Sequence, residues 1–321
     1  MRRRRRVPGR ASSATIPTVN TRSERPPLAD PDLRRSWLFI GGVPGAAALE
    51  ATLACRADVV IVDLEDFTPP PSRPEARASL AALLGRLRAG GAITSVRVNA
   101  PGHDDAEADL AAAMAAGTDI VALPMADRAE TVQTLCAAIA AHESQRGRAV
   151  GSTELLPVCE TARGVADVRS LAAASARVRA ALLGAEDLAA DLCAERTAEG
   201  IELAHARQRF LLDARAAGIE PIDAPCTFAD PALAVAEARH ARRLGYRCKA
   251  LVRAEHVAGV HGALTPSAGE LRQARAMVAA FEAARARGED RALHEGLWVE
   301  VPTWRAALRL IERACRLGVR D

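Results

Sequence analysis

The chain has 321 residues, 49% of them hydrophobic and 26% charged, which is typical of a globular protein with a sizeable buried core. No apolar run approaches the roughly 18 residues that a membrane-spanning helix needs, so we expect no span. The seven cysteines are scattered without a C-x-x-C pair or a Cys/His cluster, which argues against a disulfide framework and a zinc site. With no apolar export segment, a reducing cytoplasm is the expected location.

The net charge of +3 is unevenly distributed. Residues 1–26 carry eight Arg and one Glu, a charge of +7, which leaves about −4 for the rest of the chain. Because this segment is rich in Pro, Ser and Thr and has no hydrophobic period, we expect residues 1–34 to form a disordered Arg-rich tail. Such an arm can contact nucleic acid, but a solvated extension explains the composition as well, and we do not expect a nucleic-acid partner.

From Ser36 onward, short β-rich apolar runs alternate with alanine-rich stretches of helical period. The expected strands are residues 37–40, 57–63, 93–99, 120–124, 155–159, 178–183, 218–222 and 248–252. The expected helices are residues 46–55, 74–88, 105–116, 129–143, 164–174, 203–217, 231–244 and 266–287. This α/β pattern predicts a (β/α)8 TIM barrel over residues 35–287, followed by a C-terminal helical extension over residues 288–321.

A doubly wound open sheet is the alternative architecture, because alternation of strands and helices does not distinguish a closed sheet from an open one. The first strand is followed by the pair Gly41-Gly42 and not by a G-x-G-x-x-G motif. The sequence therefore gives no sign of a dinucleotide-binding turn.

Polar residues gather where the predicted strands end, which is where barrel enzymes carry their catalytic groups. They are Asp63, Glu65, Asp66, Arg97, Asn99, Glu160, Glu186, Asp187, Asp223 and Arg253. Crowded carboxylates repel one another, and a divalent cation relieves that repulsion. Oxygen ligands without His or Cys favour Mg²⁺, with Mn²⁺ possible, and Glu160 and Asp187 are the best candidate ligands because each follows an apolar strand. Arg97 suits capture of a substrate carboxylate.

Each of these residues also has a structural interpretation. Asp63 and Glu65 can cap the next helix or pair with Arg77, and Arg253 can pair with Glu255 instead of holding an anion. Acids at four separate strand ends favour the metal site.

Several motifs, taken in order, resemble the citrate lyase beta subunit-like group of the HpcH/HpaI aldolase superfamily over residues 35–302. They are Arg35-Ser36-Trp37-Leu38-Phe39, Asp63-Leu64-Glu65-Asp66, Ala76-Arg77, Arg97-Val98-Asn99, Leu123-Pro124, Glu160-Thr161-Ala162-Arg163-Gly164, Gly184-Ala185-Glu186-Asp187-Leu188-Ala189-Ala190-Asp191-Leu192 and Leu264-Thr265-Pro266-Ser267.

The resemblance implies a Mg²⁺-dependent carbon-carbon lyase that cleaves or forms a malyl, citramalyl or citryl thioester of coenzyme A. The products are an acyl-CoA and a 2-oxo acid. The family's metal ligands fall on Glu160 and Asp187, and its carboxylate-binding arginine falls on Arg97. Glu65 and Asp66 would hold a water molecule or the substrate hydroxyl. Members form trimers or hexamers in which the C-terminal extension is a lid that reaches a neighbouring active site.

The chain departs from the family pattern at the expected mouth of the barrel. Gly41-Gly42 replaces Pro-Gly, Met125 replaces the Lys of Leu-Pro-Lys, and Val252-Arg253-Ala254 replaces Ile-His-Pro. In the lid, Glu300 stands for the family's Asp, so an acid/base carboxylate is retained with one more methylene. Three alternatives to the lyase stay open: hydrolysis of the same thioester, CoA-independent pyruvate aldol chemistry, and a degenerate barrel that only binds.

Overall fold

The structure is a computed structural model that describes residues 28–321, so the expectation for residues 1–27 lies outside the described range. Eight parallel strands form a closed barrel, and the pairing of Trp37 with Ala250 joins the first strand to the last. The strands are β1 (Ser36–Gly41), β2 (Val59–Asp63), β3 (Ile93–Arg97), β4 (Ile120–Leu123), β5 (Glu154–Cys159), β6 (Ala180–Leu183), β7 (Glu220–Cys226) and β8 (Cys248–Leu251). Closure confirms the predicted (β/α)8 barrel and excludes the doubly wound sheet.

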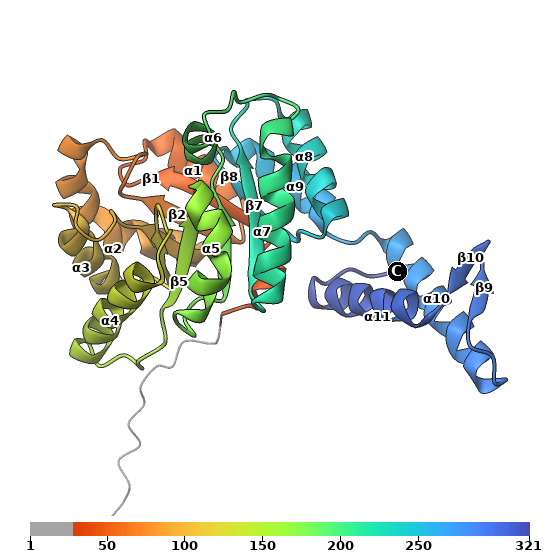
Figure 1. Cartoon of the computed structure of the whole chain (residues 1–321). Helices are drawn as coiled ribbons and strands as arrows, with labels where there is room; N and C mark the ends of the chain where they lie inside the picture. The colour runs from red at the N-terminus through yellow and green to blue at the C-terminus, as the bar shows by residue number, and fades with distance from the viewer. Residues whose placement is uncertain (1–27) are drawn as a thin grey trace, which may run out of the picture.

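Helices surround the barrel, as Figure 1 shows. They are α1 (Ala46–Cys55), α2 (Arg73–Ala89), α3 (Ala106–Ala115), α4 (Ala129–Gln145), α5 (Ala162–Ala173), the short α6 (Glu186–Asp191), α7 (Ala204–Ala216), α8 (Pro231–Leu244) and α9 (Val257–Leu264). Because strand side chains alternate, Val60 and Val62 face the helices while Val59 and Ile61 fill the barrel interior, all at most 1% exposed. None of the helices within residues 28–321 has the length and apolar character to cross a bilayer.

The helix expected at residues 266–287 exists as α10 (Ala268–Ala286), but its predicted place on the barrel was wrong. The short α9, which the sequence analysis did not predict, follows β8 instead. A capping box between Ser267 and Glu270 then starts a new helix. This helix packs against α11 (Val301–Arg316), where Phe281 stacks on Trp304 with ring centroids 5.6 Å apart. With the hairpin β9 (Ala292–His294) and β10 (Leu297–Val299), these helices form an extension that projects from the barrel (Figure 1).

The expectation of disorder was wrong for residues 28–34, which pack at the N-terminal ends of the strands. The Arg34 side chain is 1% exposed, and its Nη1 lies 2.6 Å from Glu154 Oε2 while Nη2 donates to Oε1. The Trp37 indole donates to the Arg34 carbonyl oxygen at 2.9 Å. A bidentate charge pair and an aromatic anchor therefore order this segment despite its composition.

Strand β7 also differs from its prediction, which ended at Ile222. The strand continues to Cys226 through an irregularity in its pairing with β8 between Asp223 and Cys226. Pro225 lies in this irregular stretch, where a residue without an N–H costs no ladder hydrogen bond. The polar Asp223, which marked a strand end in the sequence, is instead a fully buried member of the strand.

A buried carboxylate on α4 provides a test of pH-dependent stability. Burial alone would raise the pKa of Glu143, but hydrogen bonds from Arg177 and from the N–H groups of Gly151 and Thr153 outweigh it and lower the pKa to about 2. This stabilisation is complete above the ordinary pKa of 4.5 and is lost as the pH falls toward 2. We therefore expect Glu143→Gln to lower the free energy of unfolding by about 1–3 kcal/mol at pH 7 and by less at pH 3.5. Denaturant unfolding at both pH values measures this, and equal differences would contradict the assignment.

Candidate functional site

A cavity of about 220 Å³ lies at the C-terminal ends of the strands, and we call it the crater. Its lining residues are Phe39, Asp66, Phe67, Arg97, Val158, Glu160, Leu182, Gly184, Ala185, Glu186, Asp187, Pro225, Thr227 and Val252. The structure thus brings Asp66, Arg97, Glu160 and Asp187 around one space, as the strand-end pattern predicts. Acids and one arginine share the crater with an apolar wall.

Arg97, the last residue of β3, is held in the floor of the crater. Its Nε and Nη2 donate to both carboxylate oxygens of Asp63, at 2.9 and 2.5 Å. The guanidinium also lies over the ring of Phe39, 5.3 Å from the centroid. The Arg97 side chain is 6% exposed, so its position is fixed by the fold before any ligand binds.

The remaining nitrogen of Arg97 faces Glu65. Nη1 lies 2.8 Å from Glu65 Oε2, yet that oxygen is buried and makes no aligned hydrogen bond. Burial raises the pKa of Glu65 to about 7, Arg97 offsets part of this effect, and the negative charges of Asp66 and Glu160 add to it. Glu65 therefore occupies the direction from which a substrate carboxylate would approach Arg97.

Glu160 follows β5 and is 4% exposed. Its Oε1 accepts a 2.7 Å hydrogen bond from the backbone N–H of Met125, whose φ of +48° lies in the left-handed region. Burial raises the pKa of Glu160 to about 7; the Met125 N–H and Arg97 lower it, and the nearby charge of Asp187 raises it further. A cation at this point would remove the repulsion.

Gly184 at the end of β6 makes room for this glutamate. A Cβ added at Gly184 would lie 2.4 Å from the Glu160 Cβ and 3.0 Å from its Oε2. We expect Gly184→Ala to displace Glu160, reduce turnover about tenfold or more and destabilise the fold by about 1–3 kcal/mol. Kinetics and thermal unfolding of the purified variant measure both effects. The matched control is Gly85→Ala on α2, where an added Cβ meets no atom within 4 Å, and wild-type values for Gly184→Ala would contradict this role.

The donor set of the crater fits Mg²⁺. Asp187, in the first turn of α6, is exposed, and both it and Glu160 line the crater. No group of three or more His, Cys, Asp or Glu side chains arranged to hold a metal ion occurs among residues 28–321. Mg²⁺ is commonly held by one or two carboxylates, with water and substrate oxygens completing its coordination, so two protein ligands suffice.

Gly41 and Gly42, which replace the Pro-Gly of the family pattern, are both required sterically. A Cβ at Gly41 would lie 2.6 Å from the Phe67 carbonyl oxygen, and one at Gly42 would lie 2.6 Å from the Ala76 Cβ. The Gly42 N–H donates to the Thr68 hydroxyl at 2.7 Å. These glycines therefore allow the turn after β2, which carries Asp66 and Phe67, to pack directly on the end of β1.

Other strand-end residues point away from the crater. Asp223, expected at the mouth, is buried against Lys249 and Arg207, so that expectation was wrong. Asn99 instead donates to Asp109 at 2.6 Å. Arg253 pairs with Glu255 at 3.2 Å and does not line the cavity.

Glu300 is not brought to the crater of its own chain. It precedes α11, its side chain is 56% exposed, and Arg291 Nη1 lies 3.8 Å away. The other end of α11 is anchored at the opposite end of the barrel, where Arg313 donates to the Leu264 carbonyl oxygen and Arg316 pairs with Asp30. A catalytic role for Glu300 thus requires the crater of another copy.

Part of the crater wall was not predicted from the sequence. Phe67 and Thr227 carried no signal, because neither ends a predicted strand. Thr227 donates to Glu186 Oε1 at 2.6 Å, and Arg196 Nε donates to the same oxygen at 3.0 Å. These contacts join the connection between β6 and α7, which carries Glu186 and Arg196, to Thr227 directly after β7.

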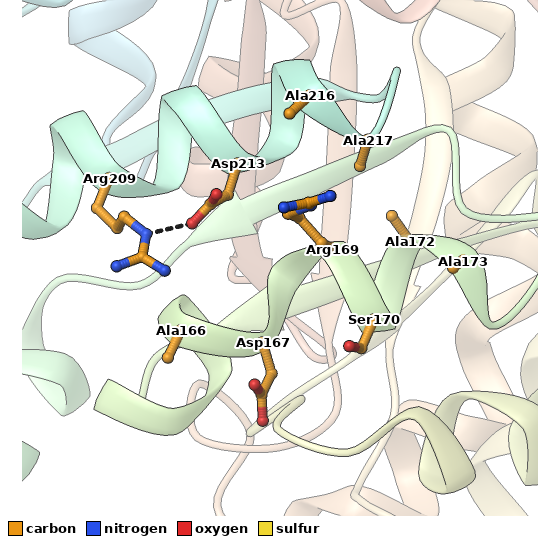
Figure 2. A pocket seen from close by; sticks show the side chains of 10 residues that line it. All are labelled: Ala166, Asp167, Arg169, Ser170, Ala172, Ala173, Arg209, Asp213, Ala216 and Ala217. Carbon is orange, nitrogen blue, oxygen red and sulfur yellow. Dashed lines mark hydrogen bonds and ion pairs between the residues drawn. The ribbon is translucent and has the colours of Figure 1, made fainter.

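A second hollow, of about 540 Å³, lies on the outer surface between α5 and α7 (Figure 2). Five of its ten lining residues are alanines and the others are charged or polar, among them the ion pair between Arg209 and Asp213. The hollow lies outside the barrel, away from the strand ends. The crater therefore carries the candidate chemistry.

Comparisons with known proteins agree with this geometry. The family model described as HpcH/HpaI aldolase/citrate lyase matches residues 35–254. Citrate lyase subunit beta of Escherichia coli (strain K12) is 34% identical over 289 residues, which cover 90% of this chain and 95% of that protein. L-malyl-CoA/beta-methylmalyl-CoA lyase of Cereibacter sphaeroides (strain ATCC 17025 / ATH 2.4.3) is 31% identical over 317 residues, covering 92% and 98%.

Solved structures show the same fold. The crystal structure of CitE from Mycobacterium tuberculosis in complex with magnesium, acetoacetate and coenzyme A has a TM-score of 0.69 and 30% sequence identity. The match covers 88% of this chain and 98% of that chain, so it extends beyond the barrel into the C-terminal extension.

Proposed function

The chain belongs to the HpcH/HpaI aldolase/citrate lyase family, and from this membership and the geometry of the crater we propose that it is a Mg²⁺-dependent lyase of 3-hydroxyacyl-CoA thioesters. It would cleave, or form, a malyl-, citramalyl- or citryl-type thioester to give an acyl-CoA and a 2-oxo acid. The observation that carries the proposal is the convergence of Glu160, Asp187 and Arg97 on one cavity at the strand ends.

Glu160 and Asp187 are the proposed ligands of Mg²⁺. Their carboxylates share the crater, and their mutual repulsion favours a divalent cation. The related CitE from Mycobacterium tuberculosis has been solved with magnesium and with coenzyme A. When bound, the cation supplies positive charge that stabilises negative charge developing on substrate oxygens.

The protein's own side chains then perform the positioning and the proton transfer. Arg97 holds the substrate carboxylate through Nη1 once Glu65 turns aside, because Asp63 already fixes its other nitrogens. A carboxylate, Glu65 or Asp66, accepts the proton of the β-hydroxyl group. The Cα–Cβ bond breaks, its electron pair passes to the thioester as an enolate, and the hydroxyl carbon becomes the carbonyl of the 2-oxo acid. Protonation of the enolate carbon by an acid completes the acyl-CoA.

We further propose that Glu300 is this acid, supplied by a second copy of the chain. The extension that carries Glu300 projects from its own barrel (Figure 1), and Glu300 is not among the residues that line the crater of its own chain. The enzyme would then be a homo-oligomer, a trimer or a hexamer, in which each extension covers a neighbour's crater.

The test is incubation of the purified protein with Mg²⁺ and malyl-, citramalyl- and citryl-CoA. Release of a 2-oxo acid from at least one thioester is the expected result, and no release from any of them would contradict the proposal. Two alternatives have distinct products. A thioesterase would release free CoA without a 2-oxo acid, and a CoA-independent aldolase would join pyruvate to an aldehyde.

Arg97→Lys tests the carboxylate-binding role. Lysine keeps a positive charge, but it lacks the planar fork that bonds Asp63 while leaving Nη1 for the substrate. We expect kcat/KM for the thioester to fall about a hundredfold, with much of the loss in KM. Steady-state kinetics measure the change, and an unchanged KM would argue against contact between Arg97 and the substrate.

A further inference from the structure

The charges that line the crater limit what it can bind. Among the described residues of its lining, Arg97 is the one cationic side chain, and Asp66, Glu160, Glu186 and Asp187 are acids. Asp63 occupies two of the three Arg97 guanidinium nitrogens, and the third, Nη1, lies 2.8 Å from Glu65 Oε2, so a ligand reaches Nη1 once Glu65 turns aside. The residues that one chain contributes to the crater can therefore offer a charge-paired position to one substrate carboxylate.

Two arginines that follow lining residues in the chain are already paired. Arg253, directly after Val252, lies 3.2 Å from Glu255 Oε1 and does not belong to the lining. Arg196 donates to Glu186 at 3.0 Å and also pairs with Glu202. Neither arginine is positioned to receive a second carboxylate inside the crater.

Of the other lining residues, Thr227 is polar, and its hydroxyl donates to Glu186 Oε1 at 2.6 Å. The large side chains of the remaining wall are apolar: Phe39, Phe67, Val158, Leu182, Pro225 and Val252. Phe67 is 46% exposed although it is a large apolar side chain, and its ring lies 6.0 Å from the Arg97 guanidinium across the crater floor. A hydrocarbon group gains free energy against such a wall, whereas a carboxylate loses its hydration without gaining a partner.

We propose that the 2-oxo acid handled by the crater is monocarboxylic with a short apolar substituent, of the pyruvate or 2-oxobutyrate class, and that a dicarboxylic acid such as oxaloacetate is discriminated against. This inference rests on the proposed lyase function and specifies its substrate class. The single ligand nitrogen of Arg97 receives the carboxylate beside the carbonyl group. The substituent lies against Phe67 and Val252, where a second carboxylate would face acids and apolar side chains.

A matched pair of acids tests the inference. 2-Oxobutyrate and oxaloacetate share a four-carbon skeleton and differ in a terminal methyl group against a terminal carboxylate. With acetyl-CoA and Mg²⁺ in the condensation direction, we expect kcat/KM for 2-oxobutyrate to exceed that for oxaloacetate about tenfold or more. A ratio of one or less would overturn the inference while leaving the lyase function intact.

Val252 offers a way to reverse the preference. In Val252→Lys an ammonium group would enter the apolar wall and pair with the second carboxylate, so the ratio should fall by about tenfold. Val252→Met has a side chain of similar length without charge and is the matched control, for which the ratio should stay above one. An equal fall in both variants would overturn the charge argument.

Calorimetric binding separates this inference from the proposed function. Each acid is titrated into the protein in the presence of Mg²⁺, without acetyl-CoA. Tighter binding of 2-oxobutyrate than of oxaloacetate supports the assignment even when no condensation occurs, in which case the lyase function alone fails. Equal affinities, or binding of neither acid, would overturn the assignment.

Discussion

Glu160→Gln is expected to abolish measurable lyase turnover, with a loss of about 10²–10³-fold or more. Glutamine keeps the volume of the side chain, and its carbonyl oxygen can still accept the hydrogen bond from Met125. The fold should therefore persist while the negative charge that faces Asp187 disappears. Because the lost charge is a proposed ligand of Mg²⁺, the apparent affinity for the metal should fall together with the rate.

Steady-state turnover at increasing Mg²⁺ concentrations measures both losses. Asp187→Asn should behave in the same way, since it removes the second proposed ligand. Asp167→Asn is the matched control, because this half-buried acid lies on α5 outside the crater and its described ion pair is with Arg163 at 3.7 Å. Wild-type turnover by Glu160→Gln would contradict the proposal that Glu160 is a ligand of Mg²⁺.

The second large effect is expected on stability, at the single lysine of the chain. Lys249 Nζ lies 2.8 Å from Asp223 Oδ2, 2.9 Å from Glu237 Oε2 and 2.6 Å from the Ala224 carbonyl oxygen, and its side chain is fully buried. Burial alone would raise the pKa of Asp223, but Lys249 and Arg207 outweigh it and lower the pKa. The lysine thus neutralises acids that lie between the barrel and its outer helices.

Lys249→Met should lower the free energy of unfolding by about 3–5 kcal/mol, because removing one member of a buried charge network leaves its partners uncompensated. Denaturant unfolding at neutral pH measures the loss. Arg128→Met is the control, since this exposed arginine lies 3.8 Å from Asp127, and we expect a change within about 0.5 kcal/mol. A loss for Lys249→Met as small as that of the control would contradict the network's role.

The sequence was sufficient to predict the barrel and much of the crater because both follow from periodicity. Eight apolar strands alternating with helices predicted the (β/α)8 barrel but left a doubly wound open sheet as the alternative, which the pairing of β1 with β8 excludes. Acids placed after strands, such as Glu160 and Asp187, predicted the crater. The prediction that Asp223 lies at the mouth was wrong, because a residue at a strand end can face either the mouth or the outer helices. Only the three-dimensional positions of Lys249 and Arg207 decide which.

The features that the sequence did not predict depend on contacts between distant segments. Arg34 is ordered by Glu154, 120 positions away, so composition alone assigned it wrongly to a disordered tail. Phe67 enters the crater because Gly41 lets its turn approach β1. The place of α10 depends on its packing with α11, which helical period alone does not reveal.

The central claim is that the crater breaks a carbon-carbon bond with the help of a divalent cation. The most direct test is to follow both products of citramalyl-CoA cleavage in one reaction. We predict pyruvate and acetyl-CoA in equal amounts, loss of both on removal of divalent cations with EDTA, and recovery when Mg²⁺ is restored. Free CoA without pyruvate, or cleavage that persists in EDTA, would contradict the account.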